Sequence, residues 1–263
     1  MMKNLSDQDI QFWNDNSYLV LRGFYKKQSS AISKWTDEVL AWERDDSKWL
    51  TDYEVTNPKQ LARRENFVSY HPQLANILKG PDILDLISEL MGEPAVLYKD
   101  RINPKFPGGG PHEAHQDGVA YEQMGRSEFD ANKTPYISIL ISVDKATTEN
   151  GCLQVVPNWP IDKLEILPME FPDPNRPQYS KMNRTMENSL IWLPLATQPG
   201  DVVLFTERLP HRSFPNNSKK MRRIIYGVYN PRSVGDLHDQ YFTQKRKHRN
   251  DPRYYIGNPH TII

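Results

Sequence analysis

The sequence contains a single cysteine, Cys152, among its 263 residues. A disulfide within the chain and a zinc site built from paired cysteines are therefore excluded. Cys152 follows the turn "ENG" in an apolar stretch, and we expect it to be a core residue and not a nucleophile. The absence of disulfides and of an apolar signal region in "MMKNLSDQDI" favours a cytoplasmic protein.

The chain also lacks an excess of charge of either sign, because 33 basic residues balance 33 acidic ones. This balance gives no electrostatic reason to expect nucleic acid or an anionic membrane as a partner. The basic run "KRKHR" at 245–249 precedes Asp251, and we interpret it as a solvated surface segment. No apolar run approaches the roughly 18 residues of a membrane helix. We therefore expect a small-molecule substrate as the partner, and a monomer or homodimer.

Signatures of phosphate loops and serine hydrolases are missing as well. The glycine run "PGGG" at 107–110 is not followed by Lys-Ser/Thr, so it predicts a turn and not a phosphate loop. No Gly-x-Ser-x-Gly occurs. Hydrophobic residues make up only 38% of the chain, but 6 Trp and 13 Tyr supply large apolar surfaces for a core.

Helical spacing of apolar residues dominates up to about residue 92. The stretch "LSDQDIQFWNDN" begins with a capping candidate, Ser6, and "SSAISKWTDEVLAWERD" has apolar residues at steps of three and four. The helix predicted in "GPDILDLISELMGE" starts at Pro81 and ends at Gly92. A strand is predicted in "SYLVLRGF" (17–24), and the rest of this part is expected to be mostly helical.

Alternation with a period of two replaces the helical spacing between about residues 93 and 231. In "PYISILISVD" the isoleucines point to one side, while Ser138 and Leu140 point to the other. Further strands are predicted in "AVLYKDRIN", "GCLQVVP", "GDVVLF" and "RRIIYGVYNP". Several short strands separated by turns predict a sandwich or barrel. We expect one domain over residues 1–263, mainly β with flanking helices, ending in a polar tail at 232–263.

The stretch "PHEAHQDG" indicates a metal site. Residues two apart on a strand share a face, so the imidazole of His115 and the carboxylate of Asp117 could reach one point in space. A second imidazole must come from elsewhere, and His211 is the best candidate because it follows the strand "GDVVLF" near a turn. Two histidines and one carboxylate are the ligand set of non-haem Fe(II) oxygenases, which leave positions open for substrate and O₂.

Arg222 lies eleven residues after His211, and the turn "PNNS" lies between them. If the chain reverses there, Arg222 returns beside the metal on a neighbouring strand. A buried guanidinium can hold a carboxylate with two parallel hydrogen bonds. A dicarboxylate cosubstrate that binds iron at one end needs such an anchor at the other end.

The order of these residues resembles the phytanoyl-CoA dioxygenase-like family of Fe(II)/2-oxoglutarate-dependent oxygenases. The stretches "SYLVLRGF", "RRENF" (63–67), "NGCLQVVP", "GDVVLFTERLPHRS" and "NNSKKMRR" resemble the family too, so the similarity spans roughly residues 5–231. These motifs are weak singly but specific together. The resemblance implies a double-stranded β-helix, a cupin-like jelly roll, with helices packed on one side.

The resemblance also implies roles for individual residues. His115, Asp117 and His211 would be the ligands of Fe(II), and Arg222 and Ser213 would hold the distal carboxylate of 2-oxoglutarate.

Other residues are placed around the cosubstrate by the same resemblance. Gln116 often lies near the cosubstrate in this family, and Leu140 falls where some relatives have an aromatic side chain packed against it. Arg63 in "RRENF" matches a basic position that covers the cosubstrate, with Arg64 as the alternative.

The reaction that the resemblance implies is hydroxylation of an unactivated C–H bond, with release of succinate and CO₂ from 2-oxoglutarate and O₂. The related halogenases lack the carboxylate ligand, so the presence of Asp117 favours hydroxylation. We expect a small polar metabolite as substrate, from secondary-metabolite tailoring or of the aminoalkylphosphonate type. Arg101, Lys105 and His112 are expected at its pocket. An acyl-CoA substrate is the alternative within the family.

Two interpretations from other classes stay open. His112, His115 and His211 could bind zinc and activate a water molecule for hydrolysis. A jelly roll without metal could act as a binding module, because His-x-Asp by itself is a common tripeptide. The hydrolase would need neither O₂ nor 2-oxoglutarate, and the binding module would take up no iron.

Overall fold

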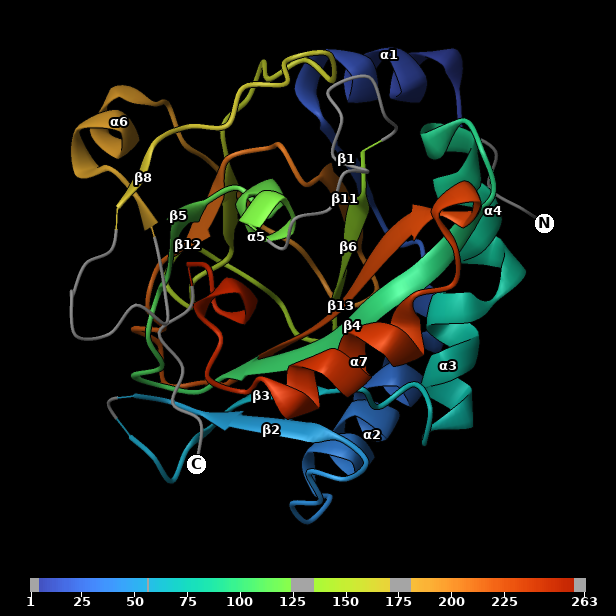
Figure 1. The fold of residues 1–263 in the computed structure, drawn as a ribbon, viewed down its shortest axis with the longest axis vertical. Helices are drawn as coiled ribbons and strands as arrows, with labels where there is room; N and C mark the ends of the chain where they lie inside the picture. Colours follow the sequence, from blue (N-terminus) through green and yellow to red (C-terminus); the bar gives the residue numbers. More distant parts are fainter. Residues whose placement is uncertain (1–4, 56, 124–134, 171–180, 258–263) are drawn as a thin grey trace.

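Two antiparallel β-sheets form the centre of the structure, a computed structural model that describes residues 5–55, 57–123, 135–170 and 181–257 (Figure 1). The strands of the large sheet are, in spatial order, β1 (Tyr18–Leu21), β11 (Val202–Thr206), β6 (Ile137–Ser142), β13 (Arg222–Pro231), β4 (Ala95–Lys105), β3 (Leu61–Glu65) and β2 (Leu50–Tyr53). Those of the small sheet are β10 (Leu193–Leu195), β7 (Leu153–Val155), β12 (His211–Ser213) and β5 (His112–His115). A separate ribbon pairs β8 (Met169–Glu170) with β9 (Lys181–Met182).

Helices cover the face of the large sheet that points away from the small sheet (Figure 1). These are α2 (Ser29–Leu40), α3 (Pro72–Lys79) and α4 (Pro81–Met91), while α7 (His238–Lys247) contacts β4. The remaining helices are α1 (Asp7–Asn16), α5 (Gly118–Gln123), α6 (Arg184–Ser189) and the 3₁₀ turns η1 (Lys26–Gln28), η2 (Arg232–Val234) and η3 (Pro252–Tyr254). Within the described part of the chain, no helix combines the length and the apolar character needed to cross a bilayer.

The alternation predicted for β6 separates two hydrophobic clusters. Its isoleucines are buried in the cluster that includes Ile32 of α2 and Ile83 of α4. Leu140 on the opposite face belongs to a second cluster, together with Leu153 of β7 in the small sheet. The predicted pattern is thus confirmed, and the interior between the two sheets is the face on which Ser138 also lies.

Several local signals of the sequence are confirmed. Ser6 caps α1 in a reciprocal capping box with Asp9. Pro81 begins α4, and Gly92 ends it at a φ of +76°, which glycine adopts without a steric penalty. The antiparallel pair β2 and β3 was not predicted, because "LARRE" carries three charged residues and no regular apolar alternation.

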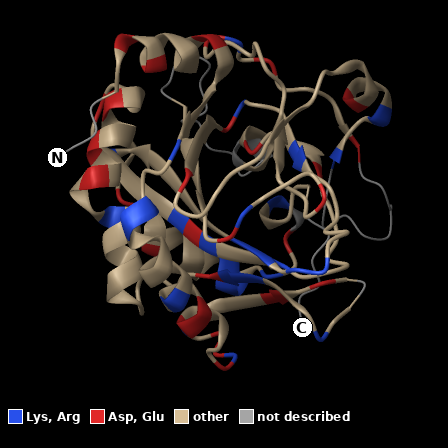
Figure 2. Cartoon of the chain, turned by 180° about the vertical axis from the view of Figure 1, so that it is seen from behind, with Lys and Arg blue, Asp and Glu red and all other residues tan. Residues whose placement is uncertain are grey.

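The basic run at 245–249 is not the solvated segment that was expected. Lys245 is fully buried and pairs with Glu65 of β3, and Arg249 pairs with Asp52 of β2 at 2.8 Å. The acidic partners precede the basic run by 180 and 197 positions, so the sequence gives no local sign of them. In Figure 2 basic segments follow the long strands through the middle of the molecule. The side chains of Lys105 on β4 and Arg222 on β13 are buried, so cations lie inside the fold as well as on its surface. The expected polar tail therefore contains a helix with a buried face. That the chain forms one domain stays a prediction.

Asp100 of β4 joins α7 to the sheet. Its carboxylate accepts the backbone N–H of Phe67 at 2.7 Å and pairs with Nε2 of His238 at 2.7 Å. Burial alone would lower the pKa of His238, but the hydrogen bond and the charge of Asp100 raise it above 6.5. A raised pKa in the folded state stabilises the fold at pH values below about 6.5, and that contribution is lost as the pH rises through the folded pKa.

We therefore expect the free energy of unfolding to fall as the pH rises above about 6.5, and the fall to be smaller in a His238→Gln variant. Urea denaturation at a series of pH values measures both. His248 is exposed after the end of α7, so His248→Gln serves as the control for loss of a histidine outside the buried pair. An unchanged slope in His238→Gln would contradict the assignment.

Candidate metal and cosubstrate site

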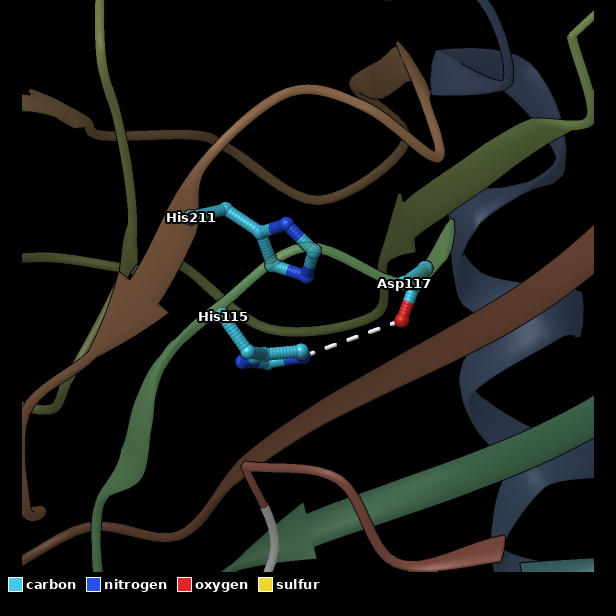
Figure 3. Close-up of side chains that lie close together, drawn as sticks. All are labelled: His115, Asp117 and His211. Carbon is cyan, nitrogen blue, oxygen red and sulfur yellow. Dashed lines mark ion pairs between the residues drawn. The ribbon is translucent and has the colours of Figure 1, made fainter. Parts of the chain in front are cut away.

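Three side chains converge between the two sheets (Figure 3). His115 on β5 and His211 on β12 are direct partners across the strand pair, and the centroids of their rings are 4.2 Å apart. Asp117 follows β5, and its Oδ1 lies 3.7 Å from Nε2 of His115. Each of the three offers one ligand atom, and these atoms lie within 4.8 Å of one another. The predicted convergence of two separate stretches of the chain is therefore present.

The way in which Asp117 reaches this point differs from the expectation. Strand β5 ends at His115, so His115 and Asp117 do not share the face of a strand. Asp117 instead lies at the turn into α5, where the N–H of Gly118 donates to the carbonyl of Glu207 at 2.9 Å. The backbone of the segment before His211 thus fixes the segment that carries Asp117.

The tautomers of both imidazoles are set by backbone carbonyls. Nδ1 of His115 lies 2.6 Å from the carbonyl oxygen of Glu113, and Nδ1 of His211 lies 2.9 Å from that of Leu209. A carbonyl oxygen can only accept, so each Nδ1 carries a hydrogen, and in a neutral imidazole Nε2 is then the nitrogen with the free lone pair. Hydrogen bonding of the second ring nitrogen is the usual way in which a protein orients a histidine ligand.

The protonation states also suit a cation. Burial lowers the pKa of His211 to about 4, and the nearby His115 acts in the same direction. Burial alone would raise the pKa of Asp117, but the neighbouring His115, His211 and Lys99 hold that pKa well below its ordinary value. At neutral pH the site therefore presents a neutral imidazole at His211 and a carboxylate at Asp117.

A hydroxyl that was not singled out from the sequence holds the carboxylate. Ser138 of β6 donates from Oγ to Oδ2 of Asp117 at 3.2 Å, which leaves Oδ1 on the side of the imidazoles. The alternation of β6 placed Ser138 on the inner face, so the signal was present. Only its distance from the metal ligands was unknown, because β6 begins twenty residues after Asp117.

Arg222, Lys105 and Ser213 form a second polar group on the inner faces of the sheets. Arg222 on β13 is the direct partner of Lys105 on β4 and is almost fully buried. Nζ of Lys105 donates to Oγ of Ser213 at 2.8 Å. Among the described residues, Nε of Arg222 has no hydrogen-bond partner. A buried donor without a partner is costly, so the group suits an anion that would complete its hydrogen bonds.

One expectation changes at this group. Arg222 does not return on a strand next to β12, because β12 belongs to the small sheet and β13 to the large one. Lys105, which was expected at the substrate pocket, lies beside Ser213 and Arg222, and its role at the substrate stays a prediction. Burial and the charge of Arg222 lower the pKa of Lys105, so a bound carboxylate would favour its charged form.

Gln116 and His112 lie elsewhere than at the ligand atoms. The side chain of Gln116 donates to the carbonyls of Glu165 and Arg208 and accepts from the N–H of Leu167. These bonds hold the segment before β8 and do not support a contact with a cosubstrate, which stays a prediction. His112 lies next to Ser213, with Nδ1 at 3.5 Å from Oγ.

The two arginines predicted to cover the cosubstrate, Arg63 and its alternative Arg64, point to opposite faces of β3. Arg63 is buried beside Glu65, while Arg64 donates to Thr51 and to the carbonyl of Trp42. Of the two arginines, Arg63 is therefore the one that shares the inner face with Glu65.

Leu140 and Arg101 both lie opposite Tyr226 of β13, one on each side of it. This places them in one row across the inner face of the large sheet. A role for either residue at the cosubstrate or substrate stays a prediction.

The donor set fits iron(II) and 2-oxoglutarate. Two imidazole lone pairs and one carboxylate are buried together, as the facial arrangement of such an iron requires. The group around Arg222 supplies cations and a hydroxyl for a carboxylate away from the metal. Among the described residues, the side chains that could together hold a metal ion are those of His115, Asp117 and His211. His112 is not one of them, so the zinc alternative has no geometric support.

Comparisons with known proteins agree with iron(II) and 2-oxoglutarate as the cofactors. The family model described as phytanoyl-CoA dioxygenase matches residues 13–224. A methylphosphonate hydroxylase of Gimesia maris is 35% identical over 249 residues, which cover 94% of this chain and 89% of that protein. A 2-aminoethylphosphonate dioxygenase from the uncultured bacterium HF130_AEPn_1 is 36% identical over 240 residues, covering 89% and 85%.

Solved structures support the fold. EctD from S. alaskensis with 2-oxoglutarate and 5-hydroxyectoine superposes with a TM-score of 0.70 at 18% identity, covering 87% of this chain and 77% of that one. The epimerase SnoN from nogalamycin biosynthesis, in complex with Fe³⁺ and α-ketoglutarate, gives 0.66 at 15%, covering 86% and 83%. The expected jelly-roll fold with flanking helices is thus confirmed. The chain belongs to the phytanoyl-CoA dioxygenase family of iron(II)- and 2-oxoglutarate-dependent oxygenases.

Proposed function

We propose that this dioxygenase hydroxylates an unactivated C–H bond of a small polar metabolite that carries a phosphonate or similar anionic group. The two relatives described above are named for phosphonate substrates, which supports this substrate class. Bound iron(II) with 2-oxoglutarate and O₂ supplies the oxidation, and succinate and CO₂ are the coproducts. We also propose that the protein acts as a monomer or homodimer in the cytoplasm and that it has no nucleic-acid partner.

Two cations on the inner face of β4 carry the substrate proposal. The guanidinium of Arg101 lies 4.7 Å from the ring centroid of Tyr226, and its Nε has no hydrogen-bond partner among the described residues. Lys99 lies two residues away, and burial lowers its pKa to about 7 although the nearby Asp117 favours the charged form. A substrate anion would complete the bonds of Arg101 and keep Lys99 protonated.

The register of the sheet supports a position of Lys99 on the side of the metal ligands. Lys99 is the partner of Val228 on β13, and Val228 is the partner of Ser138, which holds Asp117. Lys105 at the cosubstrate group lies six residues from Lys99, or roughly 20 Å at about 3.3 Å per residue. The anionic substrate and 2-oxoglutarate would therefore bind at opposite ends of the inner face of β4. Arg222 would orient 2-oxoglutarate, and Arg101 would orient the carbon to be oxidised.

A substrate screen tests this proposal directly. We expect succinate release with methylphosphonate or 2-aminoethylphosphonate, and none that depends on an acyl-CoA. Arg101→Gln should raise the substrate KM about 10- to 100-fold, because it removes a charged hydrogen bond worth about 1.5–3 kcal/mol. The KM for 2-oxoglutarate should stay within about twofold.

Lys34→Gln on the exposed surface of α2 is the matched control and should leave both KM values unchanged. Preference for an acyl-CoA would contradict the substrate class. Turnover without O₂ and 2-oxoglutarate would contradict the reaction and favour the hydrolase.

A further inference from the structure

The chain after α7 returns to the metal site. We call residues 254–257 the closing segment. Tyr255 in this segment is almost fully buried, and its ring centroid lies 5.1 Å from Nζ of Lys245. The N–H of Glu113 on β5 donates to the carbonyl of Gly257 at 2.8 Å. The buried ion pair of Lys245 with Glu65 thus anchors α7 on one side, and the strand that carries His115 receives the closing segment on the other.

Gly257 lies directly against the imidazole of His115. A Cβ atom added to Gly257 would lie 2.3 Å from Nδ1 and 2.7 Å from Cγ and Cε1 of that ring. These separations are far below van der Waals contact. Gly257 also has a φ of +65°, a region that glycine adopts without a steric penalty. The position therefore disfavours a side chain for two independent reasons.

One residue connects Gly257 with the metal ligand. Glu113 donates its N–H to Gly257, and its carbonyl accepts the Nδ1–H of His115 at 2.6 Å. The ring is thus held at Nδ1 by a hydrogen bond and along its edge by the backbone of Gly257. In this orientation of the ring, Nε2 points toward Asp117 and His211, where the ligand atoms converge.

We propose that Gly257 is a positioning residue of the metal centre. Its bare backbone lets the closing segment lie against His115, and this contact fixes the direction of the Nε2 lone pair. The proposal rests on the metal centre but not on the substrate class. It makes the region after α7 part of the iron site, although that region contributes no ligand in the described part of the chain.

The test compares two glycine substitutions. Gly257→Ala should force the imidazole to move, whereas Gly92→Ala introduces the same backbone strain at a φ of +76° with no atom within 4 Å of the added Cβ. Metal-free protein is titrated anaerobically with Co(II), and binding is read from the visible absorption bands. We expect Gly257→Ala to bind Co(II) about 10- to 100-fold more weakly and with altered bands, the range found when groups that orient ligands are removed. Saturating Fe(II) should restore most of kcat.

A second substitution separates steric contact from backbone strain. Gly257→Asn tolerates positive φ better than alanine, but it adds the same Cβ, so it should weaken Co(II) binding as much. Wild-type affinity and bands in both variants would overturn the proposal, while succinate release by the wild type would still support the function. Loss of the fold in both variants, measured by thermal unfolding, would also overturn it, because the glycine would then support the fold as a whole.

Discussion

His211→Ala is expected to abolish 2-oxoglutarate turnover and to weaken iron binding by more than 100-fold. The imidazole supplies one of three ligand atoms that lie within 4.8 Å of one another, and among the described residues no histidine besides His115 and His211 belongs to that group. Removing a group that only orients a ligand already costs about 10- to 100-fold, so removing a ligand should cost more. Anaerobic titration with Fe(II), followed by a succinate assay, measures both effects.

His248→Ala is the matched control, because His248 is exposed near the end of α7. It should keep wild-type affinity and turnover. Retention of iron binding and activity in His211→Ala would show that the converging side chains are not the metal site. Intact ligand binding with no turnover in the wild type would instead favour a binding module.

Arg222→Leu is expected to raise the KM for 2-oxoglutarate by at least about 30-fold. A buried charge that loses its partner costs about 2 kcal/mol or more, and tenfold corresponds to about 1.4 kcal/mol. The neighbouring Lys105 retains part of the attraction for the carboxylate, which keeps the expected loss near the lower end of the range. Initial rates of succinate formation at varied 2-oxoglutarate measure the effect.

Arg212→Leu provides the comparison for this effect. Arg212 lies one residue after His211 but points to Glu187 and packs over Trp192, away from the inner face. Its removal should leave the 2-oxoglutarate KM unchanged. If Arg222→Leu and Arg212→Leu had equal effects, the cosubstrate group around Arg222 would be wrong.

The inner faces of the strands were the part of the site that the sequence predicted best. Alternation in β6 assigned Leu140 and Ser138 to one face, and the order of His115, Asp117 and His211 indicated the ligands. Both signals are local, or depend only on residue types that metals require.

Contacts between distant segments were the part that the sequence could not predict. Glu65 and Lys245 are 180 positions apart, and nothing near either residue indicates that a buried partner exists. The pairing of Lys105 with Arg222 could not be predicted, because it depends on which strands are neighbours. Gly257 was not noticed, because a glycine that fits against a ring looks the same in the sequence as one in a loop.

The position of β13 in the large sheet has a consequence for synthesis of the protein. This strand, residues 222–231, lies between β6 and β4, which precede it in the chain. Until the ribosome has released it, both older strands have unpaired edges that other nascent chains could join. At about 5–20 residues per second, that interval lasts several seconds after β6 is made. Arg222, the proposed anchor of the cosubstrate, is made only with this strand, and the closing segment at 254–257 follows later still, so a complete centre requires near-complete translation.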